Sequence, residues 1–246
     1  MKNLKESQGQ NKAQITVSKI VRSFLVLAIL SVASSSFGQT KEVEFDVYTN
    51  SPTNASQYLL GDDVAMRDCA SVNCEKLTTL NIGTNVRLLA KSETAQTING
   101  ITSRFYKIKM GPQVGWIWGG LISQKTMVSQ NNPEIKFVFG EAGVDYKGYK
   151  RFQIRAVKNG AEIDRIFVKS ETLHHDLVHL MQKTDSTAVA DVIGICENNS
   201  ENCDVSTSKT FIVFKGNKLM QTNSLAALEH VRGDASDYVL SCEFDN

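Results

Sequence analysis

The sequence predicts a mostly β protein, in which a small barrel is followed by an α+β domain made of an antiparallel sheet with one or two helices. Three observations predict this. Short runs that alternate polar and apolar residues recur along the chain, as they do in half-buried strands. Turn dipeptides such as Asn99-Gly100 and Asn159-Gly160 separate these runs and are typical of tight hairpins. The polar stretch 124–133, which contains Asn-Asn-Pro, indicates a linker between two β-rich regions.

The first 38 residues have the organisation of a secretory signal peptide. Basic residues precede an apolar run from Phe24 to Ala33, and Ser36-Phe37-Gly38 offers small residues at the positions that a signal peptidase reads. The run is too short to cross a bilayer as a stable helix. We therefore expect cleavage after Gly38 or Gln39 and a periplasmic or secreted protein. An uncleaved leader is the alternative, and it would then be the protein's contact with a membrane.

The composition argues against a disordered protein and against a nucleic-acid partner. Hydrophobic residues make up 41% of the chain, which contains three prolines. The net charge of +1 becomes −3 without residues 1–38, because these hold five of the 27 basic residues and one of the 26 acidic residues. No concentrated basic face is evident. No phosphate loop or dinucleotide fingerprint appears, so we expect no cofactor.

The first β-rich region is expected to span residues 58–123, after an extension or linker at 39–57. The alternation of apolar residues and the position of turn residues define its strands. The dipeptide Gly111-Pro112 is expected to form the last turn between strands. The expected strands are residues 64–67, 85–89, 104–110 and 114–118.

Several short motifs follow one another in this region. Met66-Arg67 comes first, then Gly83-Thr84-Asn85-Val86, Tyr106-Lys107-Ile108 and Gly115-Trp116-Ile117, and Leu121 closes the series. Their order and spacing resemble a bacterial SH3 domain (SH3b), which is a small barrel. The resemblance implies a module that binds a cell-wall peptide or a protein segment and that does no catalysis. The chain departs from the family in a cysteine-bracketed loop and in an insert at 92–103, and both alter surfaces that SH3 barrels use for ligands.

The aromatic residues of this region are its candidate ligand contacts. Trp116 and Trp118 are two residues apart on one expected strand, so their side chains point the same way. Because so small a core cannot easily hold both, one interpretation exposes Trp118 as a stacking platform while Trp116 packs structurally. The other packs Trp118 against the neighbouring domain. The candidate ligand-binding residues are Trp118, Tyr106, Trp116, Tyr58 and Arg67.

The five cysteines all follow the leader, where disulfides would persist. Their spacing favours two local disulfides, Cys69–Cys74 and Cys196–Cys203, over a metal site, because zinc knuckles space their ligands differently and need partners that are missing here. Cys242 is left over and could replace a partner of the second pair.

The ending Ser-Phe-Gly-Gln of the leader resembles exported proteins of Bacteroidetes.

Residues 134–246 resemble no family that we recognise. Ser170 is expected to cap a helix that begins at Glu171 and continues through Leu180 and Met181. A second, short helix is expected at 225–230. The expected strands are residues 135–139, 151–157, 163–168, 188–196, 209–214 and 238–244.

Two histidines of the first of these helices would share one face. His175 and His179 have the spacing at which two imidazoles can bind one metal ion, and Asp176 lies between them. We favour imidazoles on the outer face of an amphipathic helix, because no third ligand is evident. The sequence thus predicts an exported, non-catalytic binding protein of the cell envelope, whose partner is peptidoglycan or an envelope protein. The alternative is an envelope hydrolase with its catalytic residues in the C-terminal domain.

Overall fold

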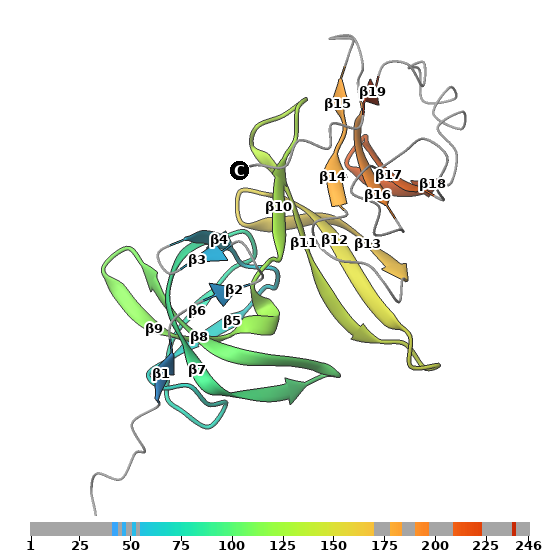
Figure 1. Cartoon of the computed structure of the whole chain (residues 1–246). Coiled ribbons are helices and arrows are strands. Elements are labelled where there is room, and N and C mark those ends of the chain that lie inside the picture. Colours follow the sequence, from blue (N-terminus) through green and yellow to red (C-terminus); the bar gives the residue numbers. More distant parts are fainter. Residues whose placement is uncertain are drawn as a thin grey trace, which may run out of the picture. The chain divides into compact units, whose positions relative to one another are not determined.

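The computed structural model of the chain describes residues 41–43, 46–47, 51–52, 55–169, 178–183, 190–196, 209–222 and 238–239 (Figure 1). The chain divides into two units, Met1–Thr40 and Lys41–Asn246, and every described residue belongs to the second. The predicted signal peptide, residues 1–38, lies outside the described residues. In the described part of the chain, no helix has the length and apolar character needed to span a membrane.

The described residues are mostly β, as predicted, and their strands pair antiparallel. Residues 39–57, predicted as an extension or linker, contain three short strands and the start of a fourth; two of the four pair with the first large sheet and two pair with each other. The strand order of the first sheet is β1-β7-β8-β9-β5-β6, with β4 paired to β7. The strands are β1 (Glu42–Val43), β2 (Asp46–Val47), β3 (Ser51–Pro52), β4 (Ser56–Tyr58), β5 (Val64–Arg67), β6 (Lys76–Leu80), β7 (Asn85–Ile98), β8 (Ile101–Met110) and β9 (Gln113–Trp118).

The first sheet is open among the described residues, and the predicted closed barrel is not formed. Closure would require a ladder between the terminal strands of the hydrogen-bonded path. Here β1 and β6 are the two ends of the path. The segments that flank the sheet meet in one isolated bridge, between Leu59 and Ile122, which follows the 3₁₀ turn η1 (Gly119–Leu121).

The hairpin of β7 and β8 is longer than the sequence predicted. Its turn is Asn99-Gly100, as expected, and both residues have positive φ, 52° and 77°. The strand β7 does not end near residue 89 but continues to Ile98, so the predicted insert at 92–103 forms the outer half of the hairpin. The register shifts between Lys91 and Ala95, where the buried Ser92 Oγ accepts a hydrogen bond from Phe105 N–H at 3.1 Å.

A second sheet follows, with the order β10-β11-β12-β13. Its first strand lies inside residues 124–133, which the sequence predicted to be a linker. That prediction fails because Met127 is buried, with 7% of its surface exposed. It packs in a core that is formed by residues far away along the chain, so the residues near it in sequence gave no sign of it. The Asn159-Gly160 hairpin turn is confirmed. The strands are β10 (Lys125–Val128), β11 (Ile135–Val144), β12 (Lys150–Lys158) and β13 (Ala161–Lys169).

A third sheet has the order β14-β16-β17-β18, and a two-stranded ladder joins β15 to β19. The apolar side chains of the second and third sheets form one core, which includes a T-shaped contact between Phe137 and Phe214 at 5.1 Å. The strands are β14 (Val178–Leu180), β15 (Gln182–Lys183), β16 (Asp191–Cys196), β17 (Lys209–Lys215), β18 (Lys218–Thr222) and β19 (Tyr238–Val239).

The prediction of a helix from Glu171 to Met181 is wrong for its C-terminal part. Val178–Leu180 is a strand that pairs with residues 193–195 of β16. The physical reason is that Val178 and Leu180 are two residues apart, so a strand brings both to the same core, and pairing with β16 satisfies their backbone. Residues 170–177 and the helix expected at 225–230 lie outside the described residues.

The other face of the second sheet contacts the first β-rich region. Val138 and Val157 cluster there with Leu60 and Ile82. Close approach depends on glycine, because a Cβ atom on Gly140 would overlap the Leu60 side chain. The second sheet therefore packs on both faces at β11 and β12, whereas on this same face of β13 Phe167 is 46% exposed.

The acid stability of the contact between β13 and β18 should depend on Asp164. Its Oδ2 accepts the Leu219 N–H at 2.7 Å, and this hydrogen bond lowers the pKa of Asp164. A carboxyl whose pKa is depressed by folding stabilises the protein above its unfolded pKa, near 4, and this stabilisation is lost as the pH falls through the folded pKa. We therefore expect the melting temperature to fall below about pH 4, and to fall less in Asp164→Asn.

Thermal unfolding between pH 7 and pH 3 measures this difference. The control is Asp63→Asn, which changes an exposed carboxylate that makes no ion pair among the described residues. An equal loss of melting temperature in the parent and in Asp164→Asn would show that Asp164 does not contribute to acid unfolding.

Candidate functional site

A pocket of about 260 Å³ lies beside the β7–β8 hairpin, where the hairpin approaches β11. We call it the hairpin pocket. Its wall combines residues of both charge signs with hydroxyl and amide groups. The polar residues that line it include Lys91, Ser103, Arg104, Tyr106, Gln124 and Glu141.

Glycines of the turn η1 shape one side of the pocket. Tyr106 is 8% exposed and lies so close to Gly119 that a Cβ atom there would be 2.5 Å from Tyr106 Cζ. Gly120, the next residue, lines the pocket itself. A larger residue at position 119 would displace the tyrosine ring, so the glycine permits Tyr106 to occupy this wall.

The hairpin supplies the cations of the pocket. Arg104 Nη1 donates a hydrogen bond to the Ser92 carbonyl oxygen at 3.1 Å, so the irregular register near Ser92 orients the guanidinium group. Lys91 lies opposite Tyr106 in the ladder. Glu141 of β11 lines the pocket from another sheet. The pocket can thus meet a carboxylate and an amine of the same ligand.

The structure buries both tryptophans, so the interpretation that exposes Trp118 as a stacking platform is wrong. Trp116 is 5% exposed and Trp118 is 7% exposed. They lie on one face of β9, as predicted, where they cluster with Phe105. Ile98 and Ile101 from the long hairpin pack against this cluster. The hairpin insert therefore covers the ring that one of the two interpretations placed on the surface.

The other candidate ligand contacts have separate surroundings. Arg67 Nη1 donates a hydrogen bond to the Cys74 carbonyl oxygen at 2.6 Å and so holds the cysteine-bracketed loop. Tyr58 is partly buried against the cluster of Leu60 and Ile82, with Lys136 Nζ 5.7 Å from its ring centre. Of the five predicted ligand contacts, Tyr106 lines the hairpin pocket and the other four do not.

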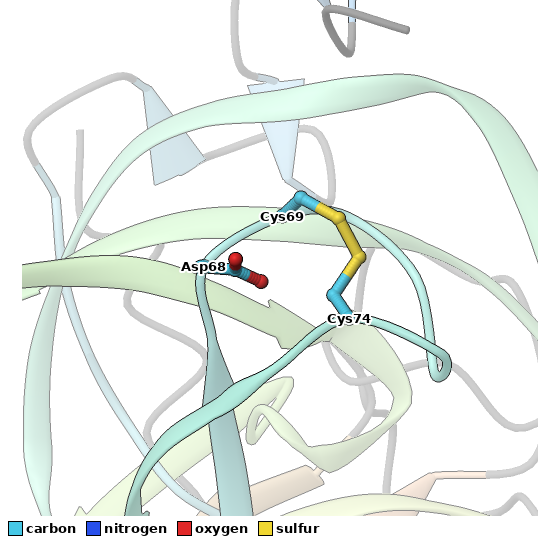
Figure 2. Close-up of side chains that lie close together, drawn as sticks. All are labelled: Asp68, Cys69 and Cys74. Atoms are coloured by element: carbon cyan, nitrogen blue, oxygen red, sulfur yellow. A yellow bond between two sulfur atoms is a disulfide. The ribbon is translucent and has the colours of Figure 1, made fainter. Parts of the chain in front are cut away.

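The predicted Cys69–Cys74 disulfide is present, with 5.6 Å between the two Cα atoms (Figure 2). Asp68 lies beside it, and these three residues are a possible metal-ligating group among the described residues. The two sulfur atoms are bonded to each other, however, and a metal ion needs free thiolates. The disulfide is compatible with an oxidising compartment.

The remaining candidate sites fall largely outside the described residues. Cys203 and Cys242 lie there, so the pairing of Cys196 at the end of β16 stays a prediction. His175 and Asp176 also lie there. His179 is in β14 and not on a helix, so the helical spacing that would bring it beside His175 is not formed at its position.

Sequence reasoning missed Lys91, Arg104 and Glu141. The available signal for Lys91 and Arg104 was the insert at 92–103. It lengthens the hairpin, and these two charged residues flank it. The contribution of β11 had no local signal, because Glu141 is 37 residues from Arg104 along the chain.

No family model matches the chain, and no curated protein or solved structure matches it either. The class that the fold and the site define is a mostly β protein with a disulfide-stapled loop and a pocket of mixed charge.

Proposed function

We propose that the chain is an exported, non-catalytic binding protein of the cell envelope, and that the hairpin pocket holds the end of a peptidoglycan stem peptide or of a protein segment. The observation that supports this is the combination of Arg104, Lys91 and Glu141 in one pocket of about 260 Å³. A peptide end presents a carboxylate, and a diamino acid in a stem peptide presents an amine. The volume is below that of typical pockets for drug-sized ligands, so it suits one or two residues.

The resemblance to SH3b domains remains part of this proposal. Three features support it: the sequence order of the strands β5 to β9, the 3₁₀ turn directly after the Gly115-Trp116 strand, and the bridge between Leu59 and Ile122 that follows the turn. The open path of the first sheet and the long hairpin depart from a simple barrel. The hairpin forms the pocket, so the departure itself would supply the binding surface.

Sedimentation with purified peptidoglycan tests the proposal. Arg104→Gln should bind about ten- to hundredfold more weakly than the parent, because one hydrogen bond to a charged group contributes about 1.5–3 kcal/mol. Lys109→Gln is the matched control, since Lys109 is an exposed cation on the same strand and does not line the pocket. The melting temperatures of both variants establish that they are folded.

Equal binding by the parent and a folded Arg104→Gln variant would exclude the hairpin pocket as the site. Soluble fragments released from peptidoglycan by the purified protein would favour the hydrolase alternative.

A further inference from the structure

Basic and aromatic side chains gather on one face of β12 and β13. Side chains alternate between the two faces of a strand. Phe152 and Ile154 of β12 belong to the core shared with the third sheet. Their neighbours along the strands therefore point to the opposite face. We call this set the arginine face, and it consists of Arg151, Arg155, Arg165, Phe167 and Lys169.

Phe167 lies exposed at the centre of the arginine face. It is 46% exposed although it is a large hydrophobic residue. The Cζ atom of Arg151 lies 5.4 Å from the centre of its ring, and that of Arg165 lies 5.8 Å away. An accessible aromatic ring thus lies near two guanidinium groups, which cation–π attraction holds beside it.

The cations of the face are paired with one another across the strands. Arg155 lies directly opposite Arg165, and Arg151 lies directly opposite Lys169. Like charges in directly opposed positions destabilise a sheet. Glu162 forms ion pairs with Arg155 and Arg165, which offset part of this repulsion.

Arg151 is the least neutralised of these cations. It forms no ion pair within the part of the chain that the structure describes, and its Nη2 donates to the Ala142 carbonyl oxygen at 3.2 Å. Its Nε is buried and has no hydrogen-bond partner there. By contrast, Lys169 has an ion pair with Asp145. An anion bound beside Arg151 and Arg165 would reduce the repulsion between the opposed cations that Glu162 does not neutralise.

We propose that the arginine face binds an acidic polysaccharide. One sugar ring would stack on Phe167, while the carboxylate of this or the next sugar is bound by Arg151 and Arg165. The planar guanidinium group matches a carboxylate with two parallel hydrogen bonds. An aromatic ring offers a flat apolar surface to a sugar ring.

The dimensions of the face suit a polymer. The strand β13 advances about 13 Å from Arg165 to Lys169. Tyr146, which is 89% exposed, follows at the end of the β11–β12 hairpin, directly after Asp145, whose carboxylate forms an ion pair with Lys169 at 2.9 Å. A chain of several sugars would therefore contact Phe167, Lys169 and Tyr146 in turn. A nucleic acid is the weaker fit, because its affinity depends on many phosphate contacts and the face offers few unpaired cations.

Affinity electrophoresis of the purified protein tests this proposal. Native gels would contain polygalacturonate, and reference gels would contain dextran, a neutral polysaccharide. We expect polygalacturonate to retard the parent and dextran to leave its mobility unchanged. Phe167→Ala and Arg165→Gln should each weaken the retardation about tenfold. Arg87→Gln, which removes an exposed arginine from β7, should be retarded like the parent.

The controls separate specific binding from general charge attraction. Equal weakening in Arg87→Gln, or equal affinity for single-stranded DNA, would show nonspecific anion binding and overturn the proposal. So would the absence of retardation by polygalacturonate. Arg165→Gln also removes the ion pair with Glu162 and could therefore be less stable than the parent. In that case Phe167→Ala decides whether the face binds the polysaccharide, because the exposed Phe167 side chain can be removed with little effect on stability. Binding to polygalacturonate does not depend on the hairpin pocket, so this test and the peptidoglycan test can fail separately.

Discussion

Truncation of Trp118 to alanine should lower the free energy of unfolding by about 3–5 kcal/mol, the cost of removing a buried aromatic side chain. The indole ring is 7% exposed and packs with Phe105 and Trp116. It lies directly against Gly120, where a Cβ atom would overlap the ring. Its Nε1–H donates to the Gln96 carbonyl oxygen at 3.3 Å, so the ring also fastens the outer part of the hairpin.

Urea denaturation of Trp118→Ala measures this loss. Tyr146→Ala is the control, because it removes an aromatic side chain that is 89% exposed, and substitutions at such surface positions usually change stability by less than about 0.5 kcal/mol. A Trp118→Ala variant as stable as the parent would mean that the hairpin does not cover the tryptophan in solution, and Trp118 would return as a candidate ligand contact.

The second large effect is expected at Asp191, at the start of β16. Its side chain is 2% exposed. Oδ2 accepts a hydrogen bond from Ser129 Oγ at 2.5 Å, and Oδ1 accepts one from Gln130 N–H at 2.8 Å. These bonds fasten the turn after β10 to the third sheet. Asp191→Ala would remove both of these hydrogen bonds and should cost about 3 kcal/mol.

The conservative variant Asp191→Asn separates the hydrogen bonds from the effect of side-chain loss. It keeps one acceptor for Gln130 N–H, so it should cost less than Asp191→Ala in the same urea titration. If the alanine variant unfolds within about 0.5 kcal/mol of the parent, Asp191 does not hold this turn.

Local turn chemistry is the part of the fold that could be predicted from the sequence. Asn99-Gly100 and Asn159-Gly160 both form turns between paired strands, and each of these residues has positive φ. Only glycine and a few residues such as asparagine adopt this conformation readily. The dipeptide therefore determines the turn whatever the rest of the chain does.

The predictions that failed depend on contacts between distant segments. Residues 125–128 are polar enough to resemble a linker, and they become a strand because they pair with β11 and because Met127 reaches the core of the second and third sheets. Val178–Leu180 fits a helix or a strand by local pattern, and pairing with β16 decides for the strand. Trp118 is buried by Ile98 and Ile101, which belong to the insert.

The candidate site could be predicted only in part for the same reason. Tyr106 was identified from its position in the SH3b-like motif. Arg104 and Lys91 depend on the irregular register of β7, and Glu141 depends on the approach of the second sheet. No pattern within a short window of sequence encodes that approach.

The most direct test of the central claim is an NMR titration of the isotope-labelled protein with a soluble peptidoglycan stem peptide. Binding in the hairpin pocket is expected to shift the backbone amide signals of Ser103, Arg104 and Glu141. A peptide whose terminal carboxylate is amidated should bind more weakly, because it no longer offers an anion to Arg104. Unchanged spectra at millimolar peptide, or shifts confined to the loop between Cys69 and Cys74, would contradict the assignment of the pocket.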